Sequence, residues 1–276
     1  MNITRRTALQ ALAAPALARA AGAKATAFAL IGDRYHNSDY IRTGLGKTLG
    51  RDAGVSIDFS DEVKLLNAEN LAGYKLLIVF RDGMLWPDGY SDEGSNASFA
   101  GRGGALKLES VPPVAPHPSQ AAFWIQPAQG KAVKDFVSNG GGVLFYHNVT
   151  YIAPHNDDFR DVLGAVTRNH PPLRRFKVKV LNNNHPITRG VSDFVVTDEQ
   201  HFMDYQKDPK NLLLQSVNED GLAFGTLGTT APAGWAYDFG KGRVCYLAPG
   251  HLLSDLWNPE YEKLQKNAVK WLLKES

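Results

Sequence analysis

The sequence predicts an α/β protein with a mostly parallel central sheet flanked by helices. Three short apolar runs carry this prediction: residues 26–31 (TAFALI), 75–80 (KLLIVF) and 143–146 (VLFY). Runs of this length, bounded by glycine or polar residues, are typical of strands that a parallel sheet buries on both faces. With 276 residues, 43% of them hydrophobic, the chain can bury one large core, and no low-complexity linker divides it.

Residues 1–23 are expected to be an export signal, and residues 24–276 a single domain. Arg5-Arg6 precedes an alanine- and leucine-rich run over residues 8–18, and Ala21-Gly22-Ala23 has the small-x-small pattern of a cleavage site. Paired arginines are typical of a twin-arginine signal, which predicts a periplasmic or extracellular protein. The apolar run is too short and too weakly apolar for a membrane span.

Composition excludes several kinds of partner and site. The net charge is +2 at pH 7, and it becomes −1 without the three arginines of the predicted signal. No basic stripe is present, so a nucleic-acid partner is not expected. The single cysteine, Cys245, excludes a disulfide within the chain and a cysteine zinc site. We expect its thiol to pack as a small buried group.

The first half of the chain alternates strands and helices. Ser38 can cap a helix that runs to about residue 49, and residues 55–59 form a second strand. Residues 67–73 are expected to form a short helical turn. A longer helix over residues 127–137 leads through three glycines into the strand at 143–146.

The second half is expected to add strands and a closing helix. Residues 174–181 alternate polar and apolar side chains, which favours an edge strand with one wet face. Gly240-Lys241-Gly242 is a turn that pairs two further strands. The remaining expected elements are a short helix at 156–163, strands at 194–196, 212–217, 235–239 and 243–248, and a helix at 259–273.

Residues 82–126 break this pattern and are expected to be an insertion. They contain glycine, proline, serine and scattered aromatic residues with no sustained period. A loop of this length inside a compact domain is usually functional or disordered, and its aromatic residues argue against full disorder. It is expected to lie near the site, either as a lid or as a surface excursion.

Four histidines follow predicted strands: His36, His147, His201 and His251. Because parallel strands end at one edge of a sheet, these imidazoles can share a cleft with Asp33 and Glu199. The alternative is that each one separately caps a loop. Four further histidines, in loops rich in Pro or Asn, are expected to be surface or structural: His117, His155, His170 and His185.

A shared cleft allows two kinds of chemistry. An imidazole beside Glu199 or Asp33 can exchange protons with a polar substrate. Alternatively, two or three imidazoles with a carboxylate can bind a divalent metal such as Zn²⁺, Mn²⁺ or Fe²⁺. No short metal motif chooses between them. Asn148 is a further polar residue at a strand exit, and the indole of Trp257 can stack on a sugar ring.

Other mechanisms lack their motifs. The sequence contains no G-x-S-x-G elbow, no P-loop and no G-x-G-x-x-G that opens a helix. Serine hydrolysis, nucleotide phosphoryl transfer and dinucleotide redox chemistry are therefore not expected.

Three segments together resemble the ThuA-like (trehalose utilisation) family. They are residues 136–143 (FVSNGGGV) leading to His147, residues 185–190 (HPITRG) followed by Asp198-Glu199, and residues 240–244 (GKGRV) leading to Gly250-His251. The resemblance covers most of the chain from residue 26 onward, and residues 82–126 match least.

The resemblance implies a class I glutamine amidotransferase-like fold, which is a flavodoxin-like sheet wrapped by helices. Amidotransferases of this fold have a cysteine at a strand-to-helix elbow, where this chain has His147-Asn148, so glutaminase activity is not expected. The late histidine of such enzymes corresponds to His251. The resemblance also implies a carbohydrate context, trehalose or a related disaccharide, including oxidised keto forms.

The leading hypothesis is therefore an exported sugar-processing enzyme in which His147, His201, His251 and Glu199 are catalytic. Asp33, His36, Asn148 and Trp257 are its expected substrate-binding residues. The alternatives are a non-catalytic sugar-binding module with the same cleft and a structural role in which the insertion fills the cleft. The sugar, the metal and the oligomeric state stay open.

Overall fold

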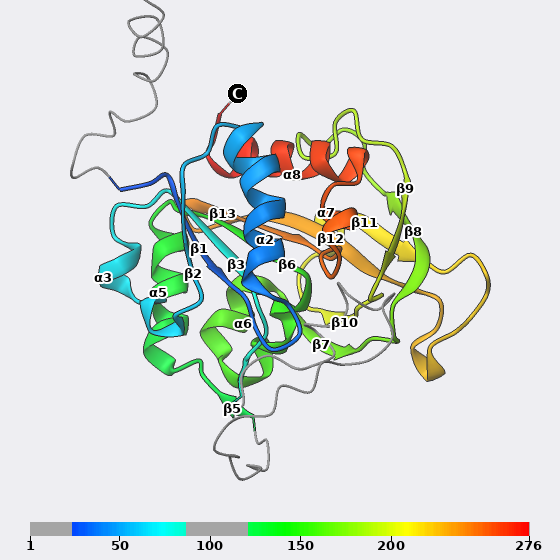
Figure 1. Ribbon diagram of the computed structural model, residues 1–276, viewed down its shortest axis with the longest axis horizontal. Coiled ribbons are helices and arrows are strands. Elements are labelled where there is room, and N and C mark those ends of the chain that lie inside the picture. The colour runs from blue at the N-terminus through cyan, green and yellow to red at the C-terminus, as the bar shows by residue number, and fades with distance from the viewer. Residues whose placement is uncertain (1–23, 87–120, 276) are drawn as a thin grey trace, which may run out of the picture.

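The computed structural model describes residues 24–86 and 121–275, and a nine-stranded sheet forms its centre (Figure 1). The strand order is β2-β1-β3-β6-β13-β12-β11-β8-β9. In this order the strands are Ile57–Ser60, Ala27–Ile31, Leu76–Phe80, Gly142–Tyr146, Gly242–Leu247, Thr230–Phe239, Leu212–Val217, Arg174–Val180 and Phe194–Asp198. The first five are parallel, and the other neighbours pair antiparallel. The predicted α/β class is confirmed.

Helices flank this sheet in two groups (Figure 1). The first group comprises α2 (Ser38–Leu45), α7 (Leu253–Leu256) and α8 (Pro259–Leu272), and α2 continues as a π-helical turn over Gly46–Arg51. The second comprises α3 (Ala68–Leu71), α5 (Pro127–Ser138) and α6 (Asp157–Leu163). Because helices cover the sheet, every residue of β1, β3 and β6 is buried, as their continuous apolar runs predict.

The helix ends follow their capping residues. Gln126 and Gln129 form a reciprocal capping box at the start of α5, and the Asn258 side chain caps α8. At α2 the predicted cap is wrong by one residue. The Asn37 side chain accepts a hydrogen bond from the Asp39 N–H, and Ser38 is the first helical residue.

The strand β8 was expected at an edge of the sheet, and this expectation is wrong. β9 pairs with β8 on its outer side and forms the edge itself. Both strands alternate buried and more exposed residues. Alternation of polar and apolar side chains indicates that one face of a strand is exposed to solvent, and it does not distinguish an edge strand from its neighbour.

A second, two-stranded sheet was not predicted. Its strands are β7 (Ala165–Asn169) and β10 (Phe202–Tyr205), which pair antiparallel with Phe202 opposite Asn169. This register places the residue after β7 beside the residue before β10. Those residues are His170 and His201.

The ends of the expected insertion are described, and they pair with each other. β4 (Met84–Leu85) lies antiparallel to β5 (Ala122–Phe123). Residues 87–120, on which the expectation of a lid depends, lie outside the described residues, as does the expected export signal at 1–23. No helix in the described part of the chain is long and apolar enough to cross a membrane.

Candidate functional site

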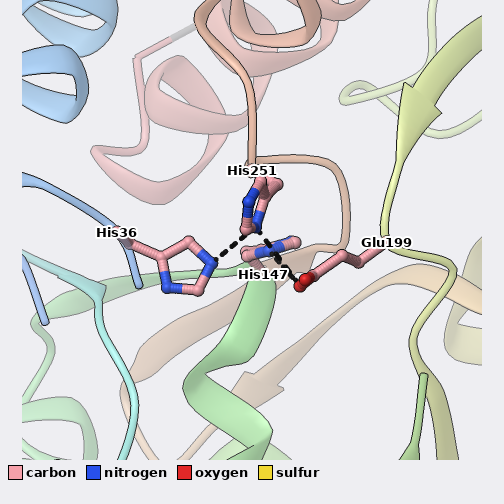
Figure 2. A group of neighbouring side chains, drawn as sticks. All are labelled: His36, His147, Glu199 and His251. Atoms are coloured by element: carbon pink, nitrogen blue, oxygen red, sulfur yellow. Dashed lines mark hydrogen bonds and ion pairs between the residues drawn. The ribbon is translucent and has the colours of Figure 1, made fainter. Parts of the chain in front are cut away.

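Asp33 and His36 lie in the loop after β1, where they form a carboxylate–imidazole pair. The Asp33 Oδ1 atom is 2.8 Å from His36 Nδ1, and it also accepts from the His36 N–H. A carboxylate only accepts hydrogen bonds, so we assign the ring proton to Nδ1. Burial opposes ionisation of Asp33, yet His36 and Asn148 hold its pKa well below the ordinary value. The His36 Nε2 atom then faces His251 Nδ1 at 3.0 Å (Figure 2).

His147 lies where β6 ends and has a left-handed backbone conformation, with φ of 50°. This conformation is uncommon for a residue with a side chain, and it is typical of functional sites that the surrounding structure holds under strain. The His147 Nδ1 atom donates to the Ala248 carbonyl at 2.8 Å, which turns Nε2 toward Glu199. Burial opposes protonation of His147, but Asp198 and Glu199 outweigh it and raise its pKa to about 9.

Asp198, the last residue of β9, joins two loops of the site. Its buried carboxylate accepts from the backbone N–H groups of Glu199 at 2.6 Å, Gly250 at 2.7 Å and His251 at 3.3 Å. The positions of Glu199 and His251 therefore depend on one carboxylate. Asp198 is not among the site residues predicted from the sequence, although it stands beside Glu199 in a segment that carries the family resemblance.

Glu199 is the common neighbour of the imidazoles. Its Oε2 atom is 3.3 Å from His251 Nδ1, 3.4 Å from His147 Nε2 and 3.5 Å from His201 Nε2. Burial opposes ionisation of Glu199, yet hydrogen bonds from these rings hold its pKa far below the ordinary value. Burial and the neighbouring His147 charge keep the pKa of His201 well below its ordinary value, so His201 is neutral at pH 7.

The four predicted histidines therefore converge with Glu199, Asp33 and Asn148. One ligand atom from each of His36, His147, His251 and Glu199 lies within 4.8 Å of every other (Figure 2). Among the described residues, these four form the group that could hold a metal ion. Trp257 is not brought to the cluster, because its indole N–H points to the Gly44 carbonyl and its ring packs against Lys47.

His170 was expected to be surface or structural, and this expectation is wrong. Its ring lies 4.8 Å from the ring of His201, and its Nδ1 atom is 3.7 Å from Glu199 Oε1. The pairing of β7 with β10 brings it there. These two strands are not apparent in the sequence pattern, so the place of His170 before Pro171 indicated a loop and not the site.

A cavity of about 340 Å³ opens beside the cluster, which is within the usual range for small-molecule sites. Its lining is mostly polar and aromatic: Tyr35, His36, Asp82, Met84, Asn148, Tyr151, His170, Glu199 and His201. Two polar atoms at this site, Asn148 Oδ1 and His201 Nδ1, are buried and have no hydrogen-bond partner among the described residues. Such atoms are costly unless a ligand satisfies them.

Asp82, which was not among the predicted site residues, lines this cavity and makes the stability of the protein depend on pH. Burial and the charge of Asp33 raise its pKa to about 7. The folded state therefore disfavours the ionised carboxylate, so stability is lost as pH rises from the unfolded value near 4 toward 7. We expect Asp82→Asn to be more stable than the wild type at pH 8 by about 1–3 kcal/mol, with little difference at pH 4.5.

Urea denaturation at the two pH values measures this difference. The exposed Asp204→Asn on β10 is the control, and it should change stability little at either pH. A loss of stability at pH 8 in Asp82→Asn would show that the folded protein favours the ionised carboxylate.

The fold and the site define an α/β protein with a histidine–carboxylate centre at the strand ends of its sheet. A family model described as ThuA, trehalose utilisation, matches residues 115–272, which is more than half of the sequence. The chain therefore belongs to the ThuA family. No curated protein matches the sequence.

Solved structures share the fold at low sequence identity. A ThuA-like protein from Bacteroides uniformis superimposes with a TM-score of 0.60 and 18% identity, over 93% of this chain and 94% of that one. A ThuA-like protein from Parabacteroides merdae superimposes with a TM-score of 0.57 and 14% sequence identity, over 90% of this chain and 89% of that one. The β-galactosidase of Rahnella sp. R3 superimposes with a TM-score of 0.53 and 14% sequence identity, over 92% of this chain and 32% of the larger enzyme.

Proposed function

We propose that this protein binds a trehalose-like disaccharide, or an oxidised keto form of one, in the cavity beside the histidine cluster, and processes it there. The family is described by trehalose utilisation, which supports a sugar as the ligand. The observation that carries the proposal is the convergence of four histidines and Glu199 beside one cavity. A cluster of this kind is costly to bury, and ionisable groups with shifted pKa values beside a cavity are typical of functional sites.

The residues of the cavity suit a sugar. A hydroxyl group both donates and accepts hydrogen bonds, so sugar hydroxyls can pair with Asn148 Oδ1 and His201 Nδ1. Tyr35 and Tyr151 give aromatic faces for the C–H side of a sugar ring. His201, neutral at pH 7, can accept a proton from a hydroxyl or from a carbon beside a keto group.

The sole thiol of the chain does not reach this site. Cys245 lies inside β13, where its side chain is buried and burial raises its pKa. The elbow position after β6 is taken by His147. The proposal therefore involves no thiolate nucleophile.

Turnover of trehalose and its keto derivatives by the purified protein tests the proposal. We expect His201→Ala to lower kcat/KM by at least about 100-fold, because a positioned proton acceptor contributes 10²–10⁴-fold. His185→Ala is the matched control, since His185 packs on Trp271 away from the cavity and its loss should leave kcat/KM unchanged.

Calorimetric binding to the same sugars separates the two carbohydrate functions. A binding module would bind a sugar without forming product, and His201→Ala would weaken only the binding. If the wild type neither binds nor converts any of these sugars, the proposal is wrong.

A further inference from the structure

We infer that His36, His147, His251 and Glu199 bind one divalent transition-metal ion, with Zn²⁺ or Mn²⁺ as the candidates. The inference deepens the proposed function, because the ion would lie beside the proposed sugar cavity. It stands on the geometry of the four side chains and on the groups that orient them. These are the residues whose ligand atoms lie within 4.8 Å of one another (Figure 2).

The spacing of the ligand atoms matches a coordination sphere. Four ligands about 2.0–2.1 Å from a tetrahedral ion stand about 3.3 Å from one another. The measured separations are 3.0 Å for His36 Nε2 to His251 Nδ1, 3.3 Å for His251 Nδ1 to Glu199 Oε2 and 3.4 Å for His147 Nε2 to Glu199 Oε2. Three of the six atom pairs therefore already have the required spacing, and the ligand atoms all lie within 4.8 Å of one another.

The imidazoles are oriented as metal-binding histidines usually are. In such sites one ring nitrogen ligates the ion, and the other donates to a carboxylate or a carbonyl. His36 Nδ1 meets Asp33 at 2.8 Å, and His147 Nδ1 meets the Ala248 carbonyl at 2.8 Å. Each acceptor holds a proton on Nδ1 and directs Nε2 at the cluster, where a bound ion would take the place of any proton on Nε2.

His251 and Glu199 are placed by backbone rather than by ring contacts. Asp198 accepts the N–H groups of both residues, which brings His251 Nδ1 and Glu199 Oε2 together. Three carboxylates therefore lie next to the histidines of the cluster, namely those of Asp33, Asp198 and Glu199. Their negative charge favours a dication over an uncharged ligand.

The chemistry of the donor set restricts the ion. Imidazole nitrogen with a single carboxylate suits Zn²⁺, Mn²⁺ and Fe²⁺, and it is a poor match for Ca²⁺ or Mg²⁺, which prefer oxygen ligands. A divalent ion at this position would polarise a hydroxyl or carbonyl oxygen of a sugar in the adjacent cavity. His201 lies beside the set, with its Nε2 3.4 Å from His147 Nε2 and 3.5 Å from Glu199 Oε2. It is not one of the four residues whose ligand atoms all lie within 4.8 Å of one another.

Metal analysis of the purified full chain tests the inference. The protein is freed of metal with a chelator, titrated with Zn²⁺ and separately with Mn²⁺, and assayed for bound ion by mass spectrometry. We expect about one ion per chain and a higher Tm with the ion bound. His147→Ala, His251→Ala and Glu199→Gln should each weaken binding by more than about 100-fold, and Asp33→Asn by about 10–100-fold.

His201→Ala and His185→Ala are the matched controls, and both should retain one ion. His201 is a buried neighbour outside the ligand set, and His185 lies away from the cluster. Circular dichroism checks that each variant is folded. If His147→Ala does not fold, His251→Gln is used in its place, because His251 is partly exposed. The absorption spectrum of the wild type with Co²⁺ bound reports imidazole ligation independently.

Two results would overturn the inference. One is a wild type that binds neither ion at micromolar concentrations, and the other is loss of the ion from His201→Ala as severe as that from His147→Ala. Metal binding needs no sugar, so its outcome is separate from that of the proposed function. If the protein binds the ion but no sugar, the metal site is supported and the proposed function is not. If the metal-free protein still converts the sugar, the proposed function is supported and needs no metal.

Discussion

Replacing Asp198 with alanine should lower the free energy of unfolding by about 3–4 kcal/mol, because it leaves buried groups without their acceptor. The Asp198 carboxylate is fully buried and accepts three backbone N–H groups, those of Glu199, Gly250 and His251. Its loss should also release the two loops that place the Glu199 and His251 side chains. We therefore expect the variant to lose metal binding and sugar turnover together with stability.

Urea denaturation measures the stability change, and Asp204→Ala is the control. Asp204 lies on β10 and is exposed, and its ion pair with Arg168 is solvated, so its loss should cost less than about 1 kcal/mol. Asp198→Asn keeps one carbonyl oxygen and should retain part of the stability. If Asp198→Ala is as stable as the wild type, the carboxylate does not hold the two loops.

A single methyl group at Gly250 should disturb the site. A Cβ atom there would lie 2.6 Å from Phe80 Cζ and 2.8 Å from His147 Cβ, and both of these side chains are buried. Overpacking of this kind costs about 1–3 kcal/mol. Because His147 must move, we expect Gly250→Ala to weaken metal binding and to lower kcat/KM more than its loss of stability alone would suggest.

Gly46→Ala is the matched control for this substitution. Gly46 has helical backbone angles, and a Cβ atom there meets nothing within 4 Å. The change should leave the site intact and stabilise the protein by up to about 1 kcal/mol. Thermal denaturation and the metal titration compare the two variants, and an unchanged metal affinity in Gly250→Ala would contradict the expected displacement of His147.

The sequence predicted those parts of the fold that depend on local patterns. The apolar runs of β1, β3 and β6 identified buried strands, and the predicted turn between β12 and β13 was confirmed. The strands β7 and β10, which within the described part of the chain pair with each other outside the main sheet, were not predicted. Their residues lack the long apolar run by which the central strands were recognised.

The candidate site was predicted in its outline and not in its contacts. Strand ends placed His36, His147, His201 and His251 at one sheet edge, because β1, β6 and β13 are parallel. β9, which precedes His201, runs in the same direction after four antiparallel pairings. The orienting role of Asp198, the cavity position of Asp82 and the approach of His170 depend on loops that meet only in the folded chain. Trp257, by contrast, was predicted to bind the substrate, and its indole N–H instead points to the Gly44 carbonyl of α2.

The sequence by itself determined the α/β class, the family and the strand-end placement of the four histidines, because each follows from short-range patterns and strand direction. Only the tertiary structure decided which nitrogen of each ring faces the centre. That choice depends on Asp33 for His36 and on the Ala248 carbonyl for His147, which lies 101 residues away from it along the chain. One of these hydrogen bonds is local and the other joins distant parts of the chain, and both depend on the folded loop geometry. The resulting ring orientation distinguishes a metal centre from four separate histidines.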